Sequence, residues 1–65
     1  MPKINKKQRR AITMLWLRCQ SETENPIGSL REFHRSAYYS YLMGCVMIEW
    51  CGMIIGIEEN GYTHS

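Results

Sequence analysis

The chain has 65 residues, a net charge of +2 and 45% hydrophobic residues, which is enough for one small domain. A chain this short buries only about 60% of its unfolded surface, so its core needs a disulfide, a metal ion or a partner chain as a supplement. The odd number of cysteines, three, argues against a disulfide scaffold, and the absence of any CxxC pair argues against structural zinc, so we expect no metal, no cofactor and an oligomer.

The first predicted helix covers residues 5–20. Asn5 can cap its start, and Gln8 three residues later can complete a capping box. Six residues fall on one side of this helix at 3.6-residue spacing and predict its buried face. They are Gln8, Ala11, Ile12, Leu15, Trp16 and Cys19.

The start of this helix is strongly basic. The run K-I-N-K-K-Q-R-R carries five positive charges in eight residues, and residues 1–20 contain no acid. Cations in a first helical turn oppose the helix dipole, which suggests that they serve another purpose. The possible nucleic-acid contacts are Lys6, Lys7, Arg9 and Arg10. No apolar run precedes residue 11, so we expect no signal peptide, and the unpaired thiols fit a reducing, intracellular setting.

Residues 21–26 are predicted to form a loop and residues 27–57 a long second helix, followed by a polar tail at 58–65. Two starts are open: Asn25 with Pro26, which we favour, or Ser29 with Glu32 in an S-x-x-E pattern. A helix of about 30 residues is about 45 Å long, twice the length of the first. The first helix therefore cannot cover the second, and a partner is required.

The second helix fits a heptad pattern with small residues at most a positions and large ones at lower d positions. The predicted packing seam consists of Leu30, Ala37, Tyr41, Gly44, Ile48, Cys51 and Ile55, with His34 at one further d position. A second apolar face consists of Leu42, Val46, Trp50, Met53 and Ile54. The predicted fold is all-α: residues 1–65 form one helical-hairpin domain that pairs into a homodimeric four-helix assembly.

A membrane span is the alternative for the same segment. Residues 37–57 contain a single charge, Glu49, and are long enough to cross a bilayer. Gly52 and Gly56 have the GxxxG spacing of tightly packed membrane helices. Glu49 near mid-span costs about 2.5–3.5 kcal/mol on insertion scales, so the water-exposed dimer is favoured.

No residue set predicts catalysis. Cys45 and Glu49 would share a helix face, but a carboxylate beside a thiol raises the thiol pKa and makes a poor nucleophile. His34 would lie about 16 Å from Cys45 along one helix, too far for a Cys–His pair. We therefore expect a non-enzymatic protein with no catalytic residues.

Two stretches together, K-I-N-K-K-Q-R-R-A-I-T-M-L-W-L-R-C-Q and I-G-S-L-R-E-F-H-R-S-A-Y-Y-S-Y-L-M-G, resemble the small early-region accessory proteins of lambda-like bacteriophages. The resemblance is to those encoded between the exonuclease and excisionase genes. It implies a regulatory protein in the host cytoplasm that acts by protein–protein interaction with a host or phage protein during early infection. Two alternatives remain open, a dimeric nucleic-acid-binding protein that uses the basic arm and a small single-span membrane protein.

Overall fold

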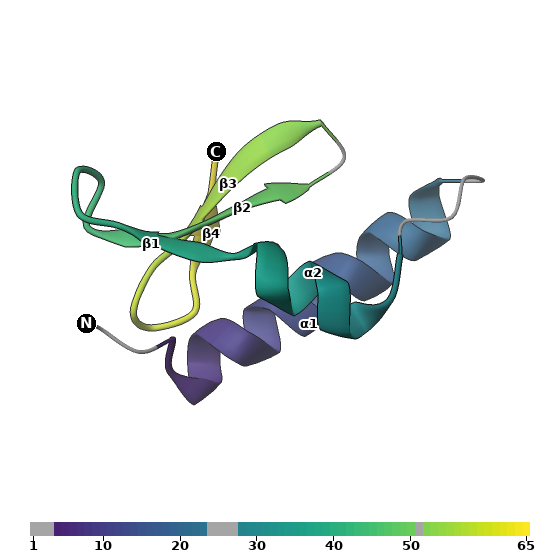
Figure 1. Cartoon of the computed structure of the whole chain (residues 1–65), viewed down its shortest axis with the longest axis horizontal. Coiled ribbons are helices and arrows are strands. Elements are labelled where there is room, and N and C mark those ends of the chain that lie inside the picture. The colour runs from purple at the N-terminus through teal and green to yellow at the C-terminus, as the bar shows by residue number, and fades with distance from the viewer. Residues whose placement is uncertain (1–3, 24–27, 51) are drawn as a thin grey trace.

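The computed structural model describes residues 4–23, 28–50 and 52–65 and shows an α+β fold (Figure 1). Two helices precede a four-stranded antiparallel sheet in which each strand pairs with the next along the chain. The elements are α1 (Lys6–Glu22), α2 (Leu30–Ser36), β1 (Tyr38–Ser40), β2 (Cys45–Trp50), β3 (Met53–Ile57) and β4 (Thr63–His64). The expected all-α helical hairpin and its four-helix assembly are therefore wrong.

Helix α1 begins with the predicted capping box. The Asn5 side chain accepts the Gln8 backbone N–H at 2.8 Å, and the Gln8 side chain accepts the Asn5 N–H at 3.0 Å. The residues of α1 that are buried are Gln8, Ile12, Leu15 and Cys19, all from the predicted face. The sequence pattern thus placed this helix and its buried side correctly.

Helix α2 has only seven residues and begins after Ser29. The Ser29 hydroxyl accepts the Glu32 backbone N–H at 3.1 Å, which is the S-x-x-E start. The favoured earlier start at Asn25 and Pro26 lies outside the described residues. The helix ends where Ala37 becomes extended, with φ −74° and ψ 142°.

Most of the predicted second helix, residues 38–57, forms strands instead. Ser40 pairs with Cys45 across one turn, and Trp50 pairs with Met53 across the next. Gly44 and Gly52, with φ of 71° and 81°, adopt the left-handed conformation that glycine permits without strain. Each of these glycines lies in the turn directly before a strand, whereas the heptad interpretation made Gly44 a contact point between helices.

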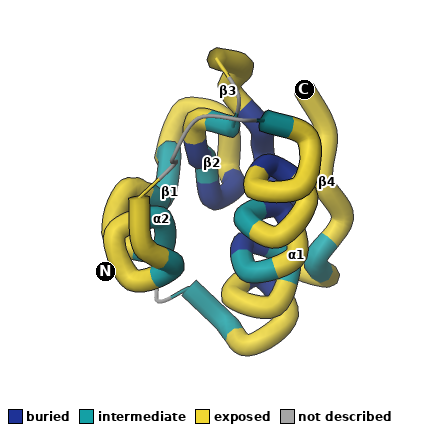
Figure 2. Tube along the Cα trace, turned by 90° about the vertical axis from the view of Figure 1, so that its right-hand side faces the viewer, coloured by how far each residue is buried: buried dark blue, intermediate teal, exposed yellow. Residues whose placement is uncertain are grey.

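The core lies between the helices and one face of the sheet. Successive side chains of a strand point to opposite faces, so Val46 and Ile48 of β2 point to the same side. With Ile55 and Ile57, which pair opposite them, they pack on the buried face of α1, as Figure 2 shows by burial. The other face of the sheet, called the open face here, carries Cys45, Met47, Glu49, Ile54 and Gly56.

The membrane alternative required a helix over residues 37–57, and that helix is not formed. Within the described ranges, neither helix combines the length and the apolar run that crossing a bilayer demands.

Candidate functional site

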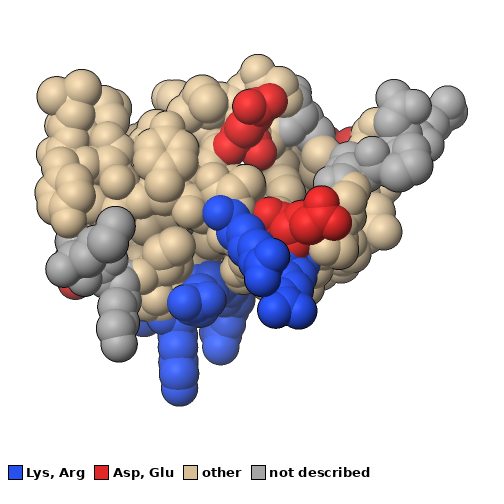
Figure 3. Space-filling model, in the orientation of Figure 1, with Lys and Arg blue, Asp and Glu red and all other residues tan. Residues whose placement is uncertain are grey.

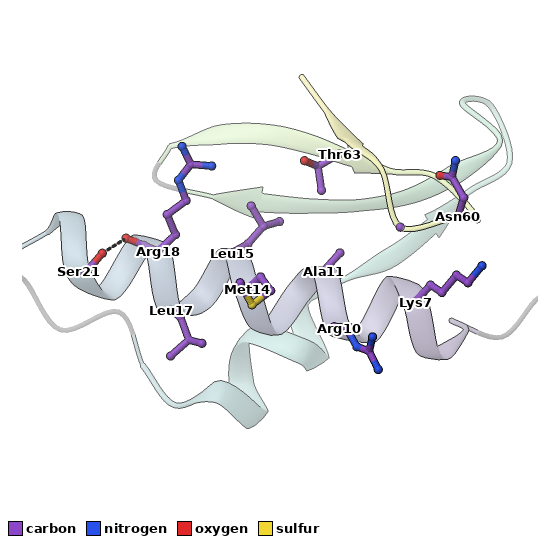
Figure 4. A pocket seen from close by; sticks show the side chains of 11 residues that line it. Lys7, Arg10, Ala11, Met14, Leu15, Leu17, Arg18, Ser21, Asn60 and Thr63 are labelled. Atoms are coloured by element: carbon purple, nitrogen blue, oxygen red, sulfur yellow. Dashed lines mark hydrogen bonds between the residues drawn. The ribbon is translucent and has the colours of Figure 1, made fainter.

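An open groove of about 780 Å³ runs along the exposed side of α1 (Figure 4). The segment that leads into β4 forms its other wall with Asn60, Gly61 and Thr63. The residues that α1 contributes are Lys7, Arg10, Ala11, Met14, Leu15, Leu17, Arg18 and Ser21. We call this feature the α1 groove.

The α1 groove combines exposed apolar side chains with cations. Met14 is 61% exposed and Leu17 is 49% exposed, so two large apolar side chains are open to solvent along this side of α1. Arg18 forms an ion pair with Glu22 at 3.5 Å, whereas no carboxylate of the described residues lies within 4.0 Å of Lys7 or Arg10. Two cations thus border an apolar stripe without partners from the described chain.

Contacts from three residues fix the second wall of the groove against α1. The Asn5 side chain donates to the Glu59 carbonyl oxygen at 2.9 Å, and Gln8 donates to the Ile57 carbonyl oxygen at 3.2 Å. Gly61 has φ of 90°, and a Cβ added there would lie 3.2 Å from the Lys7 carbonyl oxygen. Glycine therefore lets the loop approach the first turn of α1.

The four cations proposed as nucleic-acid contacts do not share one surrounding. Lys7 and Arg10 line the α1 groove. Lys6 lines a second, smaller hollow beside Glu59, and Lys7 lines this hollow as well. Arg9 lies near His34 of α2. The pKa of His34 is lowered from its ordinary value, mainly by burial and in addition by repulsion from the Arg9 charge. Figure 3 shows the Lys and Arg side chains gathered on the helical side of the molecule.

A second cluster of chemically active groups occupies the open face of the sheet. One ligand atom each from Cys45, Glu58 and His64 lies within 4.8 Å of the other two. The closest approach is between Glu58 Oε2 and His64 Nε2, at 2.6 Å. The Cys45 sulfur also lies 3.5 Å from the Met47 sulfur. A thiol, a carboxylate and an imidazole are thus brought together from three parts of the chain.

The electrostatics of this cluster disfavour nucleophilic catalysis. Burial raises the pKa of the Cys45 thiol, and the charge and hydrogen bond of Glu58 raise it further. A hydrogen bond with the Ile57 backbone opposes them in part. The thiol therefore stays protonated, and a protonated thiol is a weak nucleophile.

The carboxylate beside Cys45 is that of Glu58 and not that of Glu49, which the helical prediction placed on the same face. In a helix Glu49 would lie one turn away, but in strand β2 the two residues are four positions and about 13 Å apart. Glu58 and His64 were assigned to a polar tail. Strand register is the signal that could have found Glu58. Because Val46 pairs with Ile57 in antiparallel strands, the preceding Cys45 lies opposite the following Glu58.

The residues of the predicted seam and second apolar face are scattered over the fold. Ile48, Ile55 and Val46 are buried in the core, while Tyr41 and Leu42 are 70% and 93% exposed in the first turn. Of the others, Leu30 lies in α2, Ala37 caps it, Gly44 lies in the first turn, Trp50 ends β2, and Met53 and Ile54 begin β3. Cys51 lies outside the described residues. The helical seam does not form, and the expected homodimer stays a prediction without that seam.

Comparisons with protein-family models, with curated proteins and with solved structures found no match to the chain. The resemblance to phage accessory proteins therefore stays a prediction from the residues quoted for it. The α1 groove and the Cys45 cluster are the two features of the described residues that bear on function.

Proposed function

We propose that this protein is a non-enzymatic interaction protein that binds an acidic, amphipathic segment of a partner protein in the α1 groove. The observation that carries the proposal is the exposure of Met14 and Leu17 beside Lys7 and Arg10. The resemblance to phage accessory proteins would make the partner a host or phage protein.

The apolar stripe supplies the affinity in this proposal. Covering exposed apolar surface is worth about 25 cal/mol per Å², so Met14 and Leu17 gain when a partner excludes water from them. Recognition of an amphipathic helix in a groove depends on such apolar anchors at one-turn spacing. Met14 and Leu17 are three residues apart on the exposed side of α1, which suits this mode.

The cations supply the selectivity. Lys7 and Arg10 have no carboxylate partner among the described residues, and carboxylates of a bound segment would pair with them. Charged groups at the rim of an interface speed association and reject wrong partners more than they add affinity. We therefore expect acidic partners to bind and basic ones to be excluded.

The lining of the groove supports binding and not catalysis. Its described residues include no His, Cys, Asp or Glu that could act as a general base. The Ser21 hydroxyl already donates to the Arg18 carbonyl oxygen at 2.9 Å. The side chains that line the groove can therefore bind a partner protein, but none of them is paired with a group that could take up or give a proton.

Nucleic acid is the competing occupant, because the same cations could contact phosphates. Phosphate binding alone, however, would leave Met14 and Leu17 without a role. Arg9 lines neither the α1 groove nor the second hollow and instead lies near His34, which also weakens a continuous phosphate track. We therefore favour the acidic peptide and make nucleic acid an outcome of the test.

The test uses a designed helical peptide with leucines on one face and glutamates on the other, a scrambled peptide of the same composition, and a short DNA duplex. Fluorescence anisotropy should show that the amphipathic peptide binds about tenfold more tightly than the scrambled one. Leu17→Ser and Arg10→Glu should each weaken it, whereas Arg35→Glu, the same charge change on α2, should not. Tighter binding of the duplex, with Leu17→Ser unaffected, would overturn the proposal.

A further inference from the structure

The open face of the sheet holds a second site that the proposed function does not use. We propose that Cys45, Glu58 and His64 bind one Zn²⁺ ion there. The site takes its ligands from β2, from the residue after β3, and from β4. It is separate from the α1 groove, so either proposal can fail while the other holds.

The ligand chemistry is that of zinc. Thiolate, imidazole and carboxylate are its usual protein ligands, and three of them leave a fourth tetrahedral position for water. The Cys45 thiol releases its proton to solvent when the ion binds, and the thiolate, the Glu58 carboxylate and a neutral imidazole then balance the charge of the ion. A neutral complex reduces the cost of holding an ion against Cys45, which is 1% exposed.

The distances between the three ligand atoms, all within 4.8 Å, need only small changes to fit a bound Zn²⁺ ion. Ligand atoms around tetrahedral zinc are about 3.2–3.7 Å apart, given metal–ligand bonds of 2.0–2.3 Å. Binding therefore requires Glu58 and His64 to separate from their present 2.6 Å contact. Both side chains are nearly half exposed and can rotate toward solvent, which also gives the ion an entry path.

Gly56 provides the space for this arrangement. It pairs with Met47 on one side and His64 on the other, so three neighbouring strands meet at a residue without a side chain. A Cβ at Gly56 would lie 2.7 Å from His64 Cε1 and 3.2 Å from Cys45 Sγ. The imidazole can therefore lie over the sheet close to the thiol only because residue 56 is glycine.

A bound ion would join the two-residue strand β4 to the centre of the sheet. Chains of this length commonly rely on a metal ion to supplement a small core. In this protein the ion would fix the last strand and, through it, the loop at Gly61 that forms one wall of the α1 groove. The inferred role is structural.

The test titrates reduced, metal-free protein with Co²⁺ as a spectroscopic probe and then with Zn²⁺ as competitor. We expect one Co²⁺ per chain, a thiolate-to-Co²⁺ charge-transfer band, and displacement by Zn²⁺. Glu58→Gln and His64→Ala should each weaken binding by about tenfold or more. Glu49→Gln, a carboxylate change on the same face, should leave the affinity unchanged.

Cysteine variants identify the thiolate. Cys45→Ser should abolish the charge-transfer band, whereas Cys19→Ser and Cys51→Ser should keep it. Because Cys45 is buried and its substitution can unfold the chain, Gly56→Ala serves as a second variant. It displaces His64 but keeps the thiol, and it should weaken Co²⁺ binding in a protein whose circular dichroism is native.

Three outcomes would overturn the proposal. One is a charge-transfer band that depends on Cys51 and not on Cys45. Another is wild-type affinity in both Glu58→Gln and His64→Ala. The last is tighter binding of Cu⁺ than of Zn²⁺ that is lost in Met47→Leu, which would show that the thioether is a ligand and that the site is built for the softer ion.

Discussion

The indole N–H of Trp50 donates a hydrogen bond to the backbone carbonyl oxygen of Leu15, with 2.8 Å between nitrogen and oxygen. The bond joins the end of β2 to the middle of α1, and the Arg18 guanidinium lies 5.8 Å from the centre of the Trp50 ring. Apolar contacts alone allow a helix to slide along a sheet, because they have no preferred direction. This bond fixes the position of α1 along β2.

We expect Trp50→Phe to lower the free energy of unfolding by at least about 1 kcal/mol, because one hydrogen bond is lost and a smaller aromatic ring replaces the indole. Urea denaturation followed by circular dichroism measures the change. Trp16→Phe is the matched control, since Trp16 donates to the Gly28 carbonyl oxygen at 3.3 Å in an exposed position. Equal losses in the two variants would contradict a special role for Trp50.

We expect Gln8→Leu to lower the free energy of unfolding more than Trp50→Phe does. Gln8 is 5% exposed, and its side chain both accepts from the Asn5 N–H and donates to the Ile57 carbonyl oxygen. Leucine removes both hydrogen bonds and leaves the Asn5 N–H without its side-chain acceptor, which costs about 1–3 kcal/mol in unfolding free energy.

Gln20→Leu makes the same change at an exposed position of α1 and should cost little. The comparison by urea denaturation separates the loss of the hydrogen bonds from the general effect of leucine on the helix. A Gln8→Leu protein as stable as Gln20→Leu would show that the two bonds contribute nothing.

The contrast between α1 and residues 38–57 shows what the sequence could predict. Helix α1 has a local start signal at Asn5 and a 3.6-residue apolar pattern, and neither depends on the rest of the chain. The cations and Met14 of the α1 groove all lie in this one helix, so the sequence pattern could also predict that wall of the groove. Its second wall at Gly61 depends on a long-range contact, which periodicity does not reveal.

The strands were missed because two patterns competed. Residues 45–50 alternate between faces, with Val46 and Ile48 inward, but they also fit a heptad. The sequences that link β1 to β2 and β2 to β3 lack the Asn-Gly and Asp-Gly pairs that mark hairpins, and the Asn60-Gly61 pair before β4 was assigned to a polar tail. Two features of the sequence favoured strands over a helix. Glycine in a helix interior costs about 1 kcal/mol each at Gly44, Gly52 and Gly56, and the segment is rich in β-branched residues. The Cys45 cluster could not be predicted without the strand register.

Gly44→Ala should reduce the unfolding free energy by about 1–2 kcal/mol through backbone strain alone. Gly44 has φ of 71°, and a Cβ added there meets nothing within 4 Å, so no steric clash contributes. Gly44→Asn should lose less, because asparagine tolerates the left-handed region. Thermal and urea denaturation measure both, and a greater loss for asparagine than for alanine would contradict this explanation.

The stability of the protein should also depend on pH through His34. Burial lowers the His34 pKa, Arg9 lowers it further, and Thr13 Oγ1 lies 2.9 Å from the ring Nε2. The unfolded chain, whose histidine has the ordinary pKa of 6.5, then binds a proton more readily than the folded one. The folded state is therefore destabilised as the pH falls through 6.5 toward the folded pKa, and it does not lose this stability above 6.5.

His34→Gln removes this titration and leaves His64 and the carboxylates in place. The difference in unfolding free energy between wild type and His34→Gln, measured by urea denaturation from about pH 8 to about pH 5, should move against the wild type on acidification. Arg9→Gln should reduce the wild-type dependence only in part, because burial is the larger cause. A difference that stays constant over this range would show that His34 titrates alike in the folded and unfolded chain, and that its position against α1 does not disfavour its charge.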